Sequence, residues 1–265
     1  MVSFPKILLG LIYQFFFVAI ILGIAGISES LILIKGRKFW AAILLGTLTA
    51  ALFLGGTITI LNKGHNQNIF LQFLNRFDAH WKQEVPVFLK AGISLAEIHA
   101  LKQFCIRYFI FAFPAWLLLG CLILSILAYY LISLVFLKTS FKINSPVAFQ
   151  NIVIPEPLIF GLILGGVLKL LELSHFKGLF LNSALGIIDN NLLVLFLGIY
   201  FIGGLTIIFF FLKRFKAPWF LRIIVYLLII YWMNATIVFA CALGIFDVWF
   251  DFRKIKSPLK PKASA

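Results

Sequence analysis

The longest apolar run of the chain limits what the chain can fold into. Residues 179–212 are 34 positions without a lysine or an arginine. As one helix this run would be about 51 Å long, whereas a bilayer's hydrocarbon core is about 30 Å thick and about 20 apolar residues cross it. The run is too long for one ordinary span and long enough for two short ones. Its only charged residue, Asp189, precedes two asparagines, which predicts a surface turn, a helix break or a polar site inside a bundle.

The composition predicts a membrane protein. Hydrophobic residues make up 63% of the chain and charged residues 12%, whereas about 25% charged is usual in soluble domains. Several separate runs of about 18 or more apolar residues indicate membrane-spanning helices. We therefore predict an all-α fold, a polytopic transmembrane bundle of six to eight spans, some short or broken, with one interfacial amphipathic helix. The lipid bilayer is its expected partner.

The excess of basic residues fits the same class. The net charge is +14, and lysines and arginines gather in short clusters between apolar runs, at 35–38, 213–216 and 253–256. Such clusters anchor helices against anionic headgroups. No basic soluble segment is present, so we expect no nucleic-acid binding. The basic C-terminal end predicts a cytoplasmic C-terminus by the positive-inside rule.

We expect a single transmembrane domain over residues 1–255, with an extramembrane or interfacial insertion over 62–106 and a basic disordered tail over 256–265. Within the insertion, aromatic and leucine residues from Phe70 to Trp81 recur at helical spacing. That pattern predicts an amphipathic helix in the membrane interface, or alternatively a lid over a substrate site, ending at Pro86.

Other local signals predict where helices begin, end and bend. Ser28-Glu29-Ser30 predicts a break in the first span, and Ser94 to Glu97 is a capping box that should start a helix. Pro114 should kink the span that ends at Leu137. After this span we expect a span from Leu158 to Leu173, which follows Pro155-Glu156-Pro157. The run 179–212 comes next, as one span or two, and a single last span follows from Trp219 to Ile245.

The candidate binding site is a polar cluster within the spans. A charge inside a membrane costs about 2.5–3.5 kcal/mol on insertion scales, so an acidic residue there is a functional candidate. Asp189 is the leading one, and amides can both donate to and accept from a small polar solute. Glu172 has Lys169 one turn earlier, which is also typical of an ion pair at a helix end. The candidate residues are Asn182, Asp189, Asn190, Asn191, Asn234 and Glu172.

Two further groups are predicted to serve packing or partner docking. Ala42, Gly46 and Ala50 repeat every four residues, and small residues at that spacing let helix backbones approach closely. Asp247, Asp251 and Arg253 lie near the C-terminus, where they indicate an anchored helix end; a cation site would need a further ligand.

The chain carries no motif for catalysis, so we predict that it is not an enzyme. The four histidines are scattered and the three cysteines form no CxxC pair, so neither a metal site nor a disulfide is expected. No Walker loop or nucleophile elbow is present, and we expect no cofactor. Transport by this chain would take its energy from a partner protein or an ion gradient.

Several segments carry a resemblance to a known family: GISLAEIHALKQF, Pro114-Ala115, NIVIP before a span, Gly203-Gly204-Leu205, and LGIFDVWFDFRKI near the end. The chain resembles the YybS-like family of predicted bacterial integral membrane proteins. That family is distantly similar to the S-components of energy-coupling-factor vitamin transporters and to the cell-shape protein MreD. The resemblance implies a multi-pass protein of the bacterial cytoplasmic (inner) membrane. Its function would be small-molecule binding or transport with a coupling module, or alternatively a non-catalytic scaffold in a cell-envelope or division-related assembly.

Overall fold

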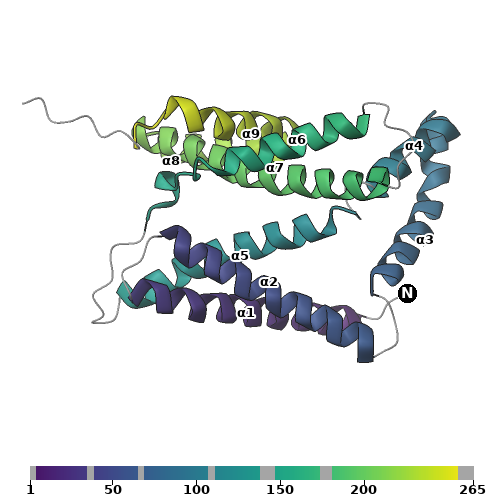
Figure 1. Cartoon of the computed structure of the whole chain (residues 1–265), viewed down its shortest axis with the longest axis horizontal. Coiled ribbons are helices and arrows are strands. Elements are labelled where there is room, and N and C mark those ends of the chain that lie inside the picture. The colour runs from purple at the N-terminus through teal and green to yellow at the C-terminus, as the bar shows by residue number, and fades with distance from the viewer. Residues whose placement is uncertain are drawn as a thin grey trace, which may run out of the picture. The chain divides into compact units, whose positions relative to one another are not determined.

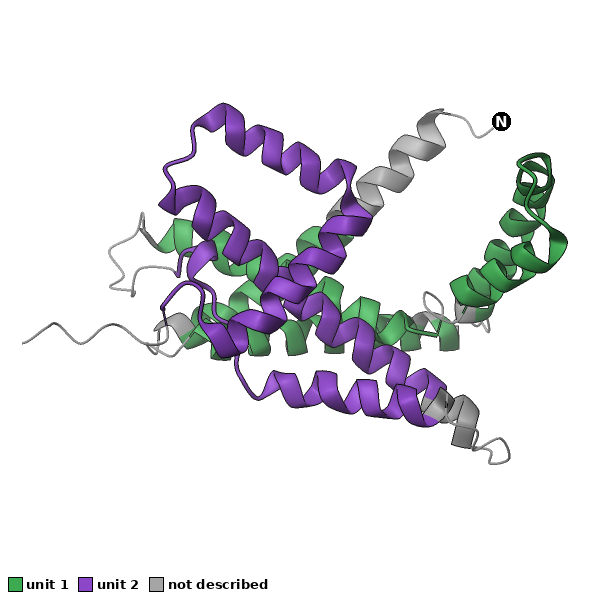
Figure 2. Ribbon diagram, turned by 90° about the horizontal axis from the view of Figure 1, so that it is seen from above, with its two compact units in different colours: residues 1–146 green, residues 147–265 purple. Residues whose placement is uncertain are grey.

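The computed structural model describes residues 4–34, 39–64, 69–106, 111–137, 147–173 and 181–255. The described residues are mainly helical and contain no strand, which confirms the all-α prediction. The chain divides into two compact units, residues 1–146 and 147–265 (Figure 2). The single domain over residues 1–255 stays a prediction. The basic cluster at 35–38 and the tail at 256–265 lie outside the described residues.

Three helices of the first unit pack on one another (Figure 1). They are α1 (Phe4–Ile34), α2 (Phe39–Gly64) and α5 (Phe113–Leu137). Small side chains bring them together, because Ala42, Gly46 and Ala50 are all buried. This face of α2 is therefore covered by the chain itself, and its role in packing or partner docking stays a prediction.

The helix α1 does not break at Ser28-Glu29-Ser30, so that prediction is wrong. It runs without interruption to Ile34. The Ser28 hydroxyl donates to the carbonyl of Ala25 and the Ser30 hydroxyl to that of Ile27, each at 2.7 Å. Bonding back to the preceding turn lets a polar residue stay inside a helix.

The predicted amphipathic helix is α3 (Ile69–Lys90), and it contains Pro86 instead of ending there, which corrects that prediction. The ring of Phe88 lies 5.8 Å from that of Trp81 and fastens the turn after the proline to the turn before it. The interfacial position of α3 stays a prediction. The capping box at Ser94 is confirmed, since Ser94 begins α4 (Leu95–Cys105) and bonds Glu97 in both directions.

Pro114 is the second residue of α5 and lies in its first turn, not in the interior of the helix. A proline is tolerated at this place because the first N–H groups of a helix have no intrahelical partner. The predicted kink at Pro114 is therefore wrong.

The second unit is built around α7 (Leu181–Arg214), which packs against α6 (Leu158–Leu173) and α9 (Met233–Phe250) (Figure 1). A 3-10 turn, η2 (Phe149–Asn151), also contacts α7. The predicted start of α6 after Pro157 is confirmed. From Leu181 onward, the longest apolar run is thus one continuous helix, without a turn at Asp189.

The last apolar segment is two helices, so the prediction of one span from Trp219 to Ile245 is wrong. The short helix α8 (Trp219–Tyr231) ends at Trp232, where φ is −102° and ψ is 45°, and α9 starts at the next residue. Neither glycine nor proline lies at this break, so no local signal predicted it.

Glycines let the backbones of α7 and α9 meet. A Cβ atom at Gly204 would collide with the carbonyl group of Ala240, and one at Gly244 would collide with that of Tyr200. Both glycines are buried. Small residues at such a crossing are typical of membrane helix pairs.

Four of the described helical segments are long and apolar enough to cross a membrane by length and composition: Phe39–Ile60, Phe113–Phe136, Gly186–Arg214 and Met233–Phe250. Three shorter apolar segments accompany them: Phe17–Ile32, Leu158–Leu171 and Trp219–Tyr231.

Candidate functional site

The candidate site lies where α6 and α7 run past each other in opposite directions. Along α6, Gly161 makes room for the ring of Phe196, and Gly165 for Leu192 and Leu193. One turn further along α6 comes Lys169. Residues later in α6 therefore contact residues earlier in α7, as expected for two antiparallel helices. The same register brings Lys169 to Asp189, one turn before Leu192.

Asp189 is fully buried in the middle of this helix pair. Its side chain is 0% exposed, and its Oδ2 lies 3.4 Å from the Nζ of Lys169. Oδ1 accepts from the backbone N–H of Asn190 at 2.6 Å. Oδ2 itself has no hydrogen-bond partner. A buried carboxylate normally has hydrogen bonds to both of its oxygens, so this one has unused accepting capacity.

Lys169 joins the aspartate to the neighbouring amide. Its Nζ donates to the Oδ1 of Asn190 at 3.3 Å, and the Nδ2 of Asn190 donates to the carbonyl of Gly186. Asn190 is fully buried, while the Lys169 side chain is 19% exposed. The cluster of Lys169, Asp189 and Asn190, hereafter the 169–190 cluster, thus presents an ammonium, a carboxylate and an amide side by side between apolar helices.

The structure brings together only part of the predicted set. Asn191 donates to the carbonyl of Ile187 on its own helix, at 2.7 Å. Asn234 is exposed in the first turn of α9, in contrast to fully buried Asp189. Asn182 lies in α7 and Glu172 in α6, and their side chains lie outside those described.

The sequence analysis paired Lys169 with Glu172 and did not predict the contact between Lys169 and Asp189. The available signal was the lysine itself, because a cation within an apolar helix needs a partner inside the bundle.

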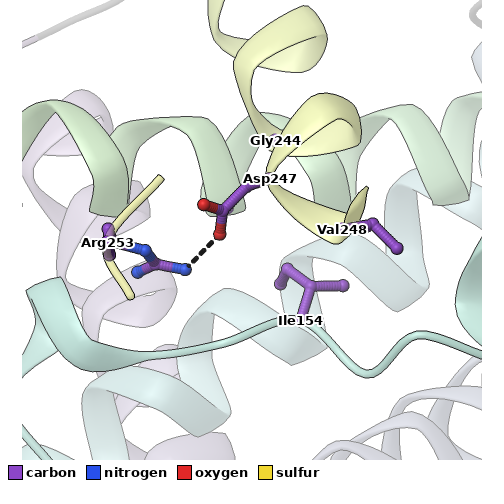
Figure 3. A pocket seen from close by; sticks show the side chains of 6 residues that line it. Ile154, Gly244, Asp247, Val248 and Arg253 are labelled. Atoms are coloured by element: carbon purple, nitrogen blue, oxygen red, sulfur yellow. Dashed lines mark hydrogen bonds and ion pairs between the residues drawn. The ribbon is translucent and has the colours of Figure 1, made fainter. Parts of the chain in front are cut away.

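The C-terminal group forms a second buried cluster (Figure 3). The Nη2 of Arg253 donates to the Oδ2 of Asp247 at 2.7 Å. Its Nη1 donates to the carbonyls of Gln150 and Ile152 at 2.9 Å and to the hydroxyl of Thr206 at 3.0 Å. The chain after α9 is thereby fastened to η2 and α7.

This second cluster fits a structural role. The hollow that it lines with Ile154 and Gly244 does not admit a water molecule. Asp251, four residues after Asp247, caps the end of α9 with φ 41° and accepts from the N–H of Ile255. The carboxylates of Asp247 and Asp251 therefore have separate partners and do not form one cation site.

Comparison with known proteins identifies the family. A family model described as "Predicted membrane protein (DUF2232)" matches residues 1–248. The chain belongs to this family. No curated protein and no solved structure matches the chain. Membership in DUF2232 establishes a predicted membrane protein; the YybS-like name, the likeness to S-components and the bacterial inner membrane stay predictions.

This DUF2232 chain holds a third buried titratable group, which the sequence analysis did not place in a site. Glu29 of α1 is 0% exposed and contacts the hydroxyl of Ser125 on α5. Gly46 of α2 stands beside both groups, and a Cβ atom there would collide with them. Gly46 thus makes room for a carboxyl group, and its place opposite Glu29 was the missed signal. Among the described residues, no group of three or more His, Cys, Asp and Glu side chains could hold a metal ion.

Proposed function

We propose that this protein is a solute-binding subunit of a membrane transport system, without an enzymatic activity or an ATPase of its own. The 169–190 cluster would be its recognition site. The observation that carries the proposal is the Oδ2 of Asp189, which is buried, lies 3.4 Å from the Nζ of Lys169 and has no hydrogen-bond partner among the described residues.

The chemistry of the cluster suits a small polar solute. An ammonium and a carboxylate held next to each other can exchange their mutual contact for the opposite charges of a ligand. The Asn190 amide adds a group that donates and accepts. Such convergent polar groups between apolar walls are typical of small-molecule sites. The resemblance to S-components supports the same class by analogy at the level of the fold.

Access to the cluster would run through Lys169. Its side chain is partly exposed, whereas Asp189 is sealed. Ligand entry would therefore begin with the lysine swinging away from Asp189 and Asn190, which opens the carboxylate. Because the chain would supply no ATP hydrolysis, a partner protein or an ion gradient would drive release.

The test is a search for a copurified small molecule. The full chain is purified in mild detergent and its bound small molecules are identified by mass spectrometry. We expect one polar compound to be enriched with the wild type and lost with Asp189→Asn, which removes the charge at nearly constant shape. The control is Asn191→Ala, because that amide bonds its own helix. A compound retained by Asp189→Asn, or no enriched compound with any variant, would contradict the proposal.

A non-catalytic scaffold in a membrane assembly is the second candidate function, and α8 favours it. This helix has 13 residues and none of them is buried. At 1.5 Å per residue it is about 20 Å long, shorter than the bilayer core of about 30 Å. A short apolar helix without a buried residue is a surface that a partner membrane protein can cover.

A crosslinking experiment distinguishes the scaffold function from the transport function. Single cysteines at Ile230 of α8 and Phe160 of α6, both 70% exposed, give a matched pair. A scaffold that docks through α8 should give one crosslinked partner of defined mass from position 230 and none from position 160. Equal products from both positions would indicate contact with the membrane environment only.

A further inference from the structure

The first unit contains a carboxyl group that is built into the fold independently of the 169–190 cluster. Glu29 of α1 is completely buried where α1 packs against α2 and α5. One of its oxygens, Oε1, contacts the hydroxyl of Ser125. The other, Oε2, is buried and has no hydrogen-bond partner in the part of the chain that the structure describes. Gly46 provides the space, because a methyl group there would overlap both the carboxyl and the hydroxyl.

The cations on the packed helices all lie far from Glu29 along the chain. The sequence of α5 contains neither lysine nor arginine, α2 contains only Lys63, in its last turn, and α1 contains only Lys6, 23 residues or about 35 Å of helix before Glu29. Lys63 is about 25 Å along the helix axis from Gly46, at 1.5 Å per residue. The other titratable groups on α5 are Cys121 and the pair Tyr129 and Tyr130. An ionised Glu29 would thus be a charge without a counter-ion among these helices, which is strongly unfavourable in a membrane interior.

The nearby cluster at 35–38 contains Lys35, Arg37 and Lys38 and lies outside the described residues. Those cations are the alternative source of a counter-ion for Glu29. An ion pair with one of them requires an ionised carboxylate, so the charge state of Glu29 distinguishes the two cases.

The single hydroxyl hydrogen of Ser125 favours a protonated, neutral Glu29. A serine hydroxyl has one hydrogen to donate. The Oγ of Ser125 has two neighbours, the carbonyl oxygen of Ile43 at 3.0 Å and the Oε1 of Glu29. A carbonyl oxygen can only accept. Both contacts are hydrogen bonds at the same time when the acid donates its own hydrogen to Ser125 and Ser125 donates to Ile43.

We propose that Glu29 is a proton-binding site enclosed by α1, α2 and α5, and that it holds its proton at neutral pH while these helices are packed. The bound species is H⁺, carried on the Oε1 and donated to the Ser125 hydroxyl. Release of the proton leaves a buried carboxylate with a single donor. Loss of the proton from Glu29 therefore weakens the packing of α1 against α2 and α5. Uptake of a proton restores that packing around Gly46. This site does not depend on solute binding at Asp189.

Infrared difference spectroscopy of the full chain in detergent micelles tests the proposal. A protonated carboxylic acid has a carbonyl stretch that is well separated from the carboxylate bands. We expect that carbonyl band at neutral pH in the wild type, its loss in Glu29→Gln, and its shift in Ser125→Ala, which removes the hydrogen bond and keeps the acid. The matched control is Asp189→Asn in the second unit, which should leave the band unchanged.

Loss of a carboxylate band in Glu29→Gln at neutral pH would overturn the proposal, because Glu29 would then be ionised, for instance by pairing with the 35–38 cluster. A carboxylate band that moves when sodium replaces choline in the buffer would also overturn it, since the site would then bind Na⁺. Ser125→Ala keeps the test decisive if Glu29→Gln does not fold: a band that does not shift in that variant does not arise from Glu29.

Discussion

Replacing Gly204 by alanine tests whether α7 and α9 depend on the close approach of their backbones. A methyl group at Gly204 would stand 2.5 Å from the carbonyl carbon of Ala240 and 2.7 Å from its Cα. Carbon atoms in favourable contact are about 3.5–4.0 Å apart, so the two helices would have to separate by roughly 1 Å. The atoms that are met belong to the backbone, and no side-chain rotation can relieve the overlap.

The magnitude follows from two opposing effects. Overpacking typically costs about 1–3 kcal/mol, and a rigid backbone neighbour puts Gly204→Ala near the upper end, about 3 kcal/mol. Alanine is the better helix former by about 1 kcal/mol. We therefore expect the free energy of unfolding to fall by about 2 kcal/mol.

The assay is unfolding of the full chain in detergent micelles by added dodecyl sulfate, followed by circular dichroism. Gly166→Ala on α6 is the matched control, because a methyl group there meets nothing within 4 Å. The control should be as stable as the wild type or more stable, and Gly204→Ala less stable. If the two variants unfold together, the backbone contact between α7 and α9 does not contribute as the structure indicates.

Three further predictions concern the other buried and exposed polar groups. Gly46→Ala should lower the free energy of unfolding by about 1–3 kcal/mol. Glu29→Ala should relieve part of that loss in the double variant, a non-additivity that a double-mutant cycle measures; simple additivity would argue against contact between Gly46 and Glu29. Arg253→Met should cost about 3–5 kcal/mol in the same unfolding titration, because it leaves Asp247 buried without its partner, and adding Asp247→Leu should restore part of the stability; no change would show that the pair is not buried. Hydrogen bonding to Lys102, and then to Lys82, lowers the pKa of Asp78, which joins α3 to α4. This contribution to stability is present above the ordinary aspartate value of about 3.9 and is lost as the pH falls through the lower folded value, so amides of α3 and α4 should exchange with solvent faster below about pH 4, and Lys102→Met should abolish that pH dependence.

Signals that act through the local backbone were predictable from the sequence. The capping box at Ser94 needs only its own four residues, and the amphipathic spacing from Phe70 to Trp81 needs only one helix. The start of α6 after Pro157 is equally local. These features came out as predicted because no distant contact had to be known.

Pro86 and the break at Trp232 are two features that could not be predicted from the local sequence. Pro86 removes one backbone hydrogen bond, yet α3 continues through it, and Phe88 packs back on Trp81 across the proline. That contact depends on side-chain geometry and not on a turn signal. At Trp232 the chain leaves helical geometry without glycine or proline, so the sequence contains nothing at that point to predict a break.

One physical reason explains why the break predicted at residues 28–30 was wrong and why the conformation at residues 189–191 was left open. Ser28-Glu29-Ser30 and Asp189-Asn190-Asn191 are strong turn sequences in water, where the solvent satisfies their side chains. Inside apolar helices the same side chains have no water. The hydroxyls and amides bond to carbonyls of the preceding turn, at Ala25, Ile27, Gly186 and Ile187.

Each triplet is left with one carboxyl that its own turn cannot satisfy, and in each case a facing helix supplies the partner. Ser125 serves Glu29, and Lys169 serves Asp189. The two partners differ in kind, since a hydroxyl suits a neutral acid and an ammonium suits a carboxylate. The two proposals therefore give the buried acids different tasks, a proton site in the first unit and a charged recognition site in the second. Exchanging the partners tests this division: Ser125→Lys should ionise Glu29 and abolish its carbonyl band, whereas Lys169→Ser should leave Asp189 without a counter-ion and make a second acid band appear. An infrared spectrum unchanged by either exchange would show that the facing side chains do not set the charge of these two acids.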